Sequence, residues 1–276
     1  MSQSPRAEPS RTTDGTAYRI HGPQDGAAVV LIHGLGLSQE VWDHALEPFA
    51  QRFRTITYDL YGHGLSVPVP DEMRPLSLTG FATQLEHLLD ELDVDAAQIV
   101  GFSIGGMINR RFALDHPDRV QSLVIVSSPH YRGADGQEAV EARAAAVRDQ
   151  GATATMDSAL IRWFTPGHLD SHPEHEESVR SWRRQADPES YAQATWVLAN
   201  GVRELIAPEP PITQPTLIMT GENDSGSTPA MSLAIAAEIE GAETVIVDRY
   251  KHLGLMEDHH AFTDPIISFL ERIING

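Results

Sequence analysis

The 276-residue chain contains no cysteine. This absence excludes disulfides, cysteine nucleophiles and thiolate metal ligands together, and it fits the cytoplasmic location that we expect. No run of 18 apolar residues is present, so the sequence predicts no transmembrane helix. The N-terminal residues also lack the apolar stretch of a secretory signal. We expect residues 1–13 to form a flexible tail.

Positive charge is scarce as well. Lys251 is the only lysine, and the formal net charge is −19. A chain this acidic should be repelled by nucleic acid and by anionic membrane surfaces, so we expect neither as a partner. The expected partner is a small-molecule substrate, and the sequence leaves a homodimer open.

The number of histidines raises the question of a metal site. Of the thirteen histidines, His168, His172 and His175 share a stretch rich in proline and glutamate. Zinc sites usually show closely matched ligand spacing, and this stretch does not. We therefore expect no metal and no organic cofactor.

Short apolar runs rich in valine and isoleucine alternate with amphipathic segments over much of the chain. The predicted strands are residues 27–32, 55–58, 98–100, 122–126, 216–220 and 244–248. Their continuous apolar character is typical of strands that are buried on both faces. Residues 78–92 carry apolar side chains at helical spacing, and residues 104–116 form a second helix that Pro117 ends. Alternation of this kind predicts an α/β fold with a parallel sheet.

The pattern changes between residues 129 and 211, where no buried strand is predicted. Residues 138–148 and 178–184 read instead as helices. After the strands return, Thr228 and Pro229 are typical of a helix start. The domain organisation that follows is one α/β core, formed by residues 14–128 and 212–276, which a helical lid at residues 129–211 interrupts.

The strongest chemical motif is Gly101-Phe102-Ser103-Ile104-Gly105. It follows a predicted strand and opens a predicted helix, so Ser103 should occupy a sharp, strained turn that presents its hydroxyl above the sheet. The flanking glycines remove side chains that would clash there. We therefore predict that Ser103 is a nucleophile, although a plain Gly/Ser turn would show the same letters.

A second glycine-bearing loop, His33-Gly34-Leu35-Gly36, follows the strand at residues 27–32. Its glycines allow backbone N–H groups to point into a site. We predict that the N–H groups of Leu35 and Ile104 form an oxyanion hole. The alternative is an ordinary turn between a strand and a helix.

Two further segments supply an acid and a base in the order that the mechanism needs. Asp224 follows the strand at residues 216–220, and His252 follows the strand at residues 244–248. Both should lie at the carboxyl edge of the sheet, where open α/β sheets build their sites. The chain order serine, aspartate, histidine favours catalysis over a turn aspartate and a solvated histidine.

Competing residues lie close to both. Glu222 and, less well placed, Asp248 are the alternative acids, and His259 and His260 are alternative bases that lie further past the strand.

Together these features resemble the α/β-hydrolase fold superfamily over residues 14–276. Asp59-Leu60-Tyr61-Gly62-His63-Gly64-Leu65-Ser66 resembles that family's D-x-x-G-x-G-x-S loop, which is structural, so the resemblance implies that His63 is not the base. It also implies a mostly parallel, twisted sheet flanked by helices, with a helical lid after the sixth strand. Some relatives carry the acid after that strand, but Ser127-Ser128-Pro129 offers no carboxylate there.

Within the superfamily, the chain looks most like 3-oxoadipate enol-lactonases and C–C-bond hydrolases. The similar segments are residues 34–38, 41–42, 52–56, 101–107 and, in the lid, 187–191. The family often has a proline soon after a Glu-Asp pair. Here Glu257-Asp258 is followed by His259 and His260, with the proline at Pro265, so the last helix is expected to start at residues 264–265.

These observations predict a serine hydrolase that cleaves an acyl bond through an acyl-enzyme. The bond is an ester, enol-lactone, amide or vinylogous C–C bond of a small metabolite that carries a carboxylate. Arg162, Trp163 and Phe164 are the first candidates for substrate binding, because arginine beside aromatic residues suits a partly apolar carboxylate. Further candidates in the lid are Arg132, Arg143, Arg183 and Arg184.

Other functions stay open. A carboxylesterase for neutral esters would need no arginine. A ligand receptor, a lyase or a cofactor-free oxygenase could use the same fold.

Overall fold

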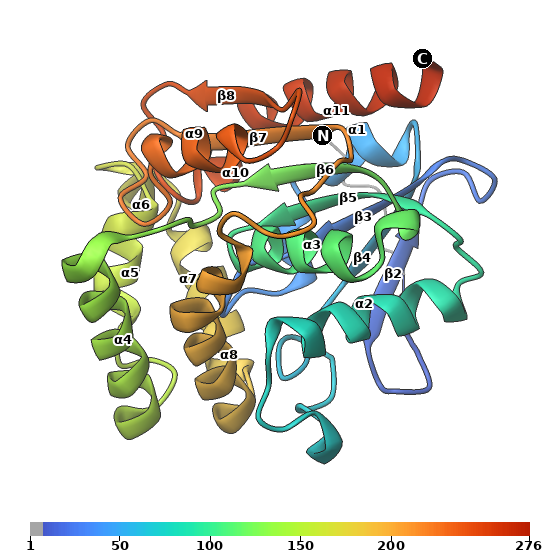
Figure 1. The fold of residues 1–276 in the computed structure, drawn as a ribbon. Helices are drawn as coiled ribbons and strands as arrows, with labels where there is room; N and C mark the ends of the chain where they lie inside the picture. The colour runs from blue at the N-terminus through green and yellow to red at the C-terminus, as the bar shows by residue number, and fades with distance from the viewer. Residues whose placement is uncertain (1–7) are drawn as a thin grey trace.

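The computed structural model describes residues 8–276, which form an eight-stranded sheet with helices on both faces (Figure 1). The strands are β1 (Ser10–Arg11), β2 (Ala17–His21), β3 (Ala28–Ile32), β4 (Arg54–Tyr58), β5 (Ala97–Phe102), β6 (Val120–Val126), β7 (Thr216–Gly221) and β8 (Glu243–Val247). Their order across the sheet is β1-β2-β4-β3-β5-β6-β7-β8. The strands β4-β3-β5-β6-β7-β8 run parallel to one another, and β2 runs antiparallel to both β1 and β4.

All six predicted strands are confirmed, with ends that differ by one or two residues. The two strands at the N-terminal edge were not predicted. The tail prediction also needs correction: Ser10 and Arg11 pair with β2, and Thr12 is buried. The Thr12 hydroxyl accepts a hydrogen bond from the backbone N–H of Thr16 at 2.9 Å. This local bond closes the turn that returns the chain to the sheet. Residues 1–7 of the predicted tail lie outside the described residues.

Helices fill the connections between the strands. The α-helices are α1 (Leu46–Ala50), α2 (Leu78–Glu91), α3 (Ile104–Asp115), α4 (Gly133–Gln150), α5 (Met156–Trp163), α6 (His168–Ser171), α7 (Pro173–Gln185), α8 (Pro188–Asn200), α9 (Pro229–Ala237), α10 (Gly254–Glu257) and α11 (His259–Asn275). Short 3-10 helices are η1 (Gln39–Trp42), η2 (Asp71–Met73), η3 (Pro117–Arg119) and η4 (Gly201–Leu205). The Thr228 side chain caps α9 as predicted, because it accepts the Met231 N–H.

The predicted start of the last helix is wrong. Helix α11 begins at His259, five residues before Asp264, and Pro265 lies inside it. Asp258 supplies the cap, since its side chain accepts the Ala261 N–H at 3.3 Å. Pro265 lies past the first turn of the helix, so it removes one backbone hydrogen bond there.

The core has two halves, one on each face of the sheet. In β3, Val30 and Ile32 pack toward α2 and α3, whereas Val29 and Leu31 pack toward α1 and α11. This alternation is what a strand buried on both faces requires. The sheet is therefore clamped between helices, which holds the carboxyl ends of its strands in fixed positions.

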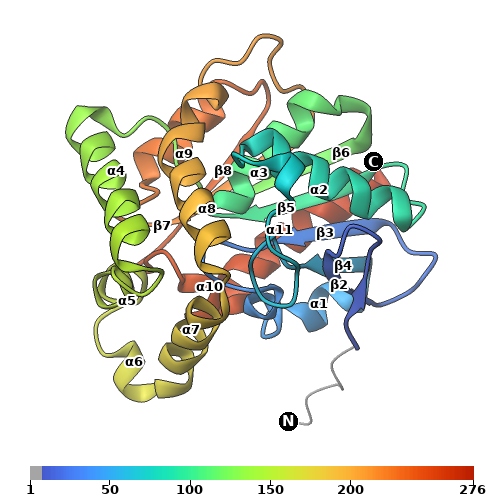
Figure 2. The same cartoon turned by 90° about the horizontal axis from the view of Figure 1, so that it is seen from below.

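The chain between β6 and β7 has a different character. Within residues 127–215, all of which the structure describes, there are helices α4 to α8 and η4 but no strand. Figures 1 and 2 show these helices gathered at one side of the molecule, beside the ends of the parallel strands. Helix α4 packs on α8 through Val140, Ala144 and Ala199. This helical layer therefore covers the edge of the sheet where the parallel strands end.

None of the helices within residues 8–276 combines the length and the apolar character that crossing a bilayer requires.

Candidate functional site

Ser103 occupies the tight turn between β5 and α3. Its backbone has φ 58° and ψ −114°, a conformation that L-residues rarely adopt. The turn is possible because its neighbours are glycines: a Cβ at Gly101 would lie 2.2 Å from the Gly105 carbonyl oxygen, and one at Gly105 would lie 2.7 Å from the Ile32 oxygen. The Ser103 N–H donates to the Val126 oxygen of β6 at 2.8 Å, which ties the turn to the sheet.

The structure brings Asp224 and His252 to the same point from the ends of β7 and β8. His252 Nδ1 lies 2.6 Å from Asp224 Oδ2, and His252 Nε2 lies 3.1 Å from Ser103 Oγ. Because an ionised carboxylate can only accept, the hydrogen of a neutral imidazole belongs on Nδ1. Nε2 then faces the serine hydroxyl as an acceptor. The three side chains are buried, with exposed fractions of 7% for Ser103, 2% for Asp224 and 8% for His252.

The backbone that follows Asp224 fixes the orientation of its carboxylate. Oδ1 accepts hydrogen bonds from the N–H groups of Gly226 at 2.8 Å and Ser227 at 2.9 Å. With Oδ1 occupied in this way, Oδ2 is directed at His252. Asp224 is thereby positioned without help from another side chain.

Two aromatic rings hold the His252 imidazole. The ring centroid of Phe102 lies 5.0 Å from that of His252, and the ring centroid of Trp163 lies 5.9 Å from it. Phe102 belongs to β5, and Trp163 is the last residue of α5. The base is therefore packed between the sheet and the helical layer above it.

The two predicted oxyanion-hole residues come from the loop after β3 and from the start of α3. Leu35 and Gly34 line the same pocket as Ser103. Ile104 is the first residue of α3, so its N–H has no acceptor within that helix.

His33 holds the loop that carries Leu35. Its Nδ1 donates to the Gly34 oxygen at 2.8 Å, and its Nε2 accepts the Leu60 N–H at 2.9 Å. Burial lowers the pKa of His33 to about 4, so the ring is neutral at pH 7 and can make both bonds.

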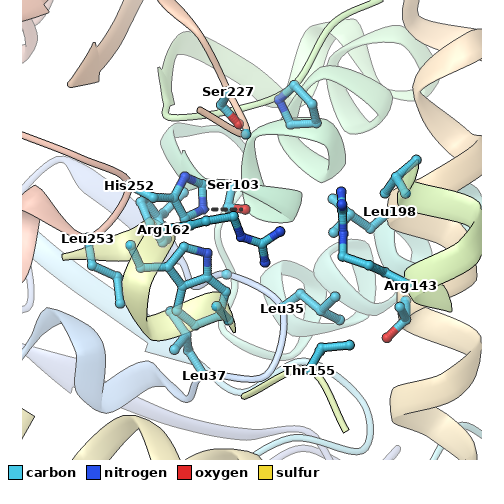
Figure 3. A pocket seen from close by; sticks show the side chains of 18 of the residues that line it. Leu35, Leu37, Ser103, Arg143, Thr155, Arg162, Leu198, Ser227, His252 and Leu253 are labelled. Atoms are coloured by element: carbon cyan, nitrogen blue, oxygen red, sulfur yellow. Dashed lines mark hydrogen bonds between the residues drawn. The ribbon is translucent and has the colours of Figure 1, made fainter. Parts of the chain in front are cut away.

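A pocket of about 940 Å³, which includes its open mouth, lies between this edge of the sheet and α4, α5, α7 and α8. Figure 3 shows Ser103 and His252 at one side of it, with Leu35, Leu37, Leu198 and Thr155 around the remaining wall. Most of the lining is apolar. The charged lining side chains are Asp224, Arg132, Arg143, Arg162 and Arg183, with His252 beside them.

The predicted binding residues divide into two groups. Arg162 and Trp163 line the pocket, as do Arg132, Arg143 and Arg183. Phe164 does not: it is 2% exposed, belongs to the core, and stacks on His168 with a centroid distance of 5.4 Å. Its assignment to the binding site is therefore wrong. Helix α5 ends at Trp163, and the extended backbone of Phe164 turns its side chain away.

Arg184 is also outside the pocket. It is exposed and forms an ion pair with Glu177 at 2.5 Å. Arg183 precedes it on α7 but is 2% exposed and faces inward. Successive residues on a helix point in directions about 100° apart, which explains the difference between these neighbours.

The pocket arginines lie close enough to repel one another. Burial, followed by the charge of Arg143, lowers the pKa of Arg132 to about 10. Burial and the charge of Arg162 lower the pKa of Arg143, and burial and the charge of Arg183 lower that of Arg162. The four guanidinium groups therefore form one strongly positive region inside a protein whose net charge is −19.

The competing candidates are occupied elsewhere. Glu222 is exposed, and its carboxylate accepts the Arg249 N–H at 3.0 Å. Asp248 is exposed as well. His260 pairs with Asp264 at 3.3 Å on the outer surface of α11. His63 is buried, with its pKa lowered by burial to about 3 and its Nδ1 on the Tyr61 oxygen at 3.0 Å.

Three histidines of the lid lie close together. His168 Nε2 lies 2.9 Å from His175 Nδ1, and the rings of His168 and His172 stack. Nevertheless, within residues 8–276 no group of three or more His, Cys, Asp or Glu side chains is arranged to hold a metal ion.

Sequence reasoning missed several pocket residues. Leu37, Thr155, Tyr191, Leu198 and Ser227 line the pocket from four separate parts of the chain, since Tyr191 and Leu198 share α8. Leu37 and Tyr191 lie in segments that resemble the family, but nothing in their local sequence marks any of the five as a pocket residue. Only the packing of α4 to α8 over the sheet brings them together.

The chain is similar to known proteins over most of its length. A family profile described as the alpha/beta hydrolase fold matches residues 27–259. The chain is 28% identical to 3-oxoadipate enol-lactonase 2 of Acinetobacter baylyi, over 92% of each chain. It is 26% identical to (E)-2-((N-methylformamido)methylene)succinate hydrolase of the same organism, over 83% of this chain and 84% of that one. Among solved structures, the enol-lactonase from Burkholderia xenovorans superposes with a TM-score of 0.85 at 27% identity, over 96% of this chain and all of that one.

Proposed function

The chain belongs to the α/β-hydrolase fold family, and from that premise we propose that it is a serine hydrolase with Ser103 as nucleophile, His252 as base and Asp224 as the acid that orients the base. One observation carries the proposal. His252 Nε2 lies 3.1 Å from Ser103 Oγ, while Nδ1 is held by Asp224 at 2.6 Å. A serine nucleophile needs such a base within hydrogen-bond distance to take its proton, and an acid that orients the base.

The mechanism follows from these positions. Ser103 Oγ attacks the acyl carbon as His252 takes the hydroxyl proton, and the carbonyl oxygen becomes an oxyanion that the N–H groups of Leu35 and Ile104 stabilise. The bond to the leaving group then breaks, and the leaving group receives the proton from His252. Water, activated by His252, attacks the resulting ester and releases Ser103. Every proton is carried by a side chain of this site, so the reaction needs no cofactor.

The substrate in this proposal is a small acyl compound with a carboxylate. Arg162 supports the idea, because Figure 3 shows its guanidinium reaching into the space beside Ser103 and His252. An acidic protein needs a local positive group to admit an anion, and charge-assisted bonds to arginine are among the strongest available. The named substrates of the two Acinetobacter relatives, an oxoadipate enol-lactone and a substituted succinate, belong to this class.

In this proposal residues 129–211 act as the lid of the site. The pocket walls come from Arg143 of α4, Arg162 of α5, Arg183 of α7 and Leu198 of α8, as well as from the sheet edge. Substrate choice would therefore be set in the lid, whereas the chemistry would be set in the core.

Active-site labelling tests the assignment of Ser103. A fluorophosphonate should label the wild-type protein on Ser103, as located by peptide mass spectrometry, and Ser103→Ala should not be labelled. Ser225→Ala, an exposed serine past the end of β7, is the control and should label normally. Labelling that persists in Ser103→Ala would remove Ser103 as the nucleophile.

Turnover separates an enzyme from a receptor. We expect the wild-type protein to hydrolyse chromogenic aryl esters and Ser103→Ala to be inactive. Labelling of Ser103 without any turnover would instead favour a ligand receptor.

A further inference from the structure

The pocket carries far more positive charge than one carboxylate would balance. Four arginines line it, and the single acidic lining residue, Asp224, is engaged with His252 and two backbone N–H groups. Partly buried charges are costly when they have no partner, because the surroundings replace water poorly. What these arginines contact in the free protein is therefore informative.

Two of the four have structural partners. Arg183 donates to the Ala152 oxygen at 3.3 Å, and its guanidinium lies over the rings of Trp163 and Tyr191, at 5.4 and 4.9 Å from their centroids. Arg132 donates to the Leu198 oxygen at 3.0 Å and binds the C-terminal end of α8. Carbonyl groups at a helix end and aromatic faces are both favourable partners for a guanidinium.

The other two, Arg143 and Arg162, form no hydrogen bond or ion pair with any residue that the structure describes. They approach the same space from different helices, α4 and α5. Figure 3 shows the Arg162 guanidinium beside Ser103 and His252, and Arg143 across the pocket beside Leu198. The wall between them is largely apolar, with Leu35, Val140 and Leu198 in it.

We propose that the substrate carries two carboxylates, one bound by Arg162 next to the bond that Ser103 attacks and the other bound by Arg143 at the far wall. This inference rests on the proposed hydrolase function and narrows its substrate class. A dianion leaves neither free guanidinium unpaired, whereas a monoanion leaves one of them. The apolar wall between the two suits a short hydrocarbon link between the charged ends. Arg162 and Arg143 are then the residues that determine specificity, each for a different carboxylate.

The test uses aryl esters that differ only in charge. One ester is neutral, two isomeric monoanions carry a carboxylate on the acyl part or on the aryl part, and a dianion carries both. Wild type should show the highest kcat/KM for the dianion and the lowest for the neutral ester. Arg143→Gln and Arg162→Gln should each lower kcat/KM for the dianion by about ten- to a hundredfold, the usual effect of losing one charge-assisted bond. Each variant should keep its activity toward one of the two monoanions and lose it toward the other, and the monoanion that is lost should differ between the two variants.

Arg184→Gln is the matched control, because it removes the same charge from the exposed side of the lid. It should leave the ranking of the four esters unchanged. A direct binding measurement accompanies the kinetics: glutarate or adipate should protect Ser103 from fluorophosphonate more strongly than butyrate does.

Each outcome decides the question. If both arginine variants lose the same monoanion, one carboxylate is clamped by two arginines and the two-carboxylate inference is wrong. If wild type cleaves all four esters equally, the pocket has no anionic preference, and the inference fails while the hydrolase proposal stands. If Ser103 is neither labelled nor required for turnover, the hydrolase proposal itself fails.

Discussion

At the scale of single residues, the position of each carboxylate relative to His252 decides which acid can act in the site. Asp224 and Glu222 lie two positions apart after β7, and both are carboxylates near the carboxyl edge of the sheet. The Asp224 side chain is 2% exposed and meets His252, whereas Glu222 is exposed and binds the backbone of Arg249. Burial makes an ion–dipole contact stronger because less water screens it.

The first prediction compares these two acids. Asp224→Asn should lower kcat by orders of magnitude, because an amide cannot hold the His252 tautomer that accepts the serine proton, and the equivalent change in a serine protease costs about 10⁴-fold. Glu222→Gln, the matched control, should change kcat by less than about tenfold. Steady-state hydrolysis of one aryl ester by the three proteins provides the measurement. The reverse order of effects would move the acid to Glu222.

At the scale of elements, one short segment joins the lid to the loop that carries His252. The Leu253 N–H donates to the Trp163 oxygen at 2.8 Å, and Lys251 Nζ donates to the Ile161 oxygen at 2.8 Å. Thr165 then donates its N–H and its hydroxyl to Glu257, at 2.8 and 2.5 Å. Residues 161–165 are therefore hydrogen-bonded to the loop 251–257 on both sides of His252. Arg162 and Trp163 lie within the segment 161–165.

The second prediction tests this coupling. Thr165→Val removes the hydroxyl bond to Glu257 but keeps the shape of the side chain, so the folded state should lose about 1.5 kcal/mol. Because Arg162 would then be held less firmly, kcat/KM should fall more for an anionic ester than for a neutral one. Thr165→Ser keeps the hydroxyl and should behave as wild type in both assays. Urea unfolding and ester kinetics check the two parts. An equal fall for both esters would mean that residues 161–165 do not position Arg162.

Elements also show where reasoning from the sequence reached its limit. The strands β3 to β7 were predictable because burial on both faces imposes an uninterrupted apolar run. Strand β8 lies at the edge of the sheet and is only partly buried, but its residues Thr244–Val247 still form a short run rich in valine and isoleucine. Strand β2 was not, since Tyr18, Arg19 and His21 interrupt its pattern at the edge of the sheet. Ser103, Asp224 and His252 were predictable as candidates because each follows a predicted strand. Phe164 was misplaced because adjacency to Arg162 says nothing about the direction of a side chain where a helix ends.

At the scale of the whole molecule, two kinds of group respond to acid in opposite ways. With a net charge of −19, neutralising carboxylates reduces the repulsion within the folded protein and favours folding as the pH falls. Buried neutral histidines oppose this. Burial holds the pKa of His33 at about 4 and that of His63 at about 3, against an ordinary value of 6.5.

The sign of the histidine effect follows from linkage. Between about pH 6.5 and the folded pKa, each of these rings is protonated when the chain is unfolded and neutral when it is folded, so unfolding takes up a proton. The stability that they contribute is complete above about pH 6.5 and is lost as the pH falls toward 4. For His33 the cause is visible, because a proton on Nε2 would face the Leu60 N–H that now donates to it.

The last prediction isolates one of these protons from the carboxylate background. Near pH 5 each buried histidine should add about 1.4 kcal/mol per pH unit to the slope of the unfolding free energy against pH. His63→Asn removes the titrating ring, so its slope should be smaller than that of wild type by about this amount, whatever its absolute stability. His260→Asn removes an exposed histidine and should leave the slope unchanged. Urea unfolding at intervals between pH 6.5 and pH 4.5 gives the three slopes. If His63→Asn and wild type have the same slope, His63 is protonated to the same extent in the folded and unfolded states. The assignment of a neutral, buried imidazole to His63 would then be wrong. A protonated His63 ring would instead lie beside the His33 ring, at a centroid distance of 5.4 Å.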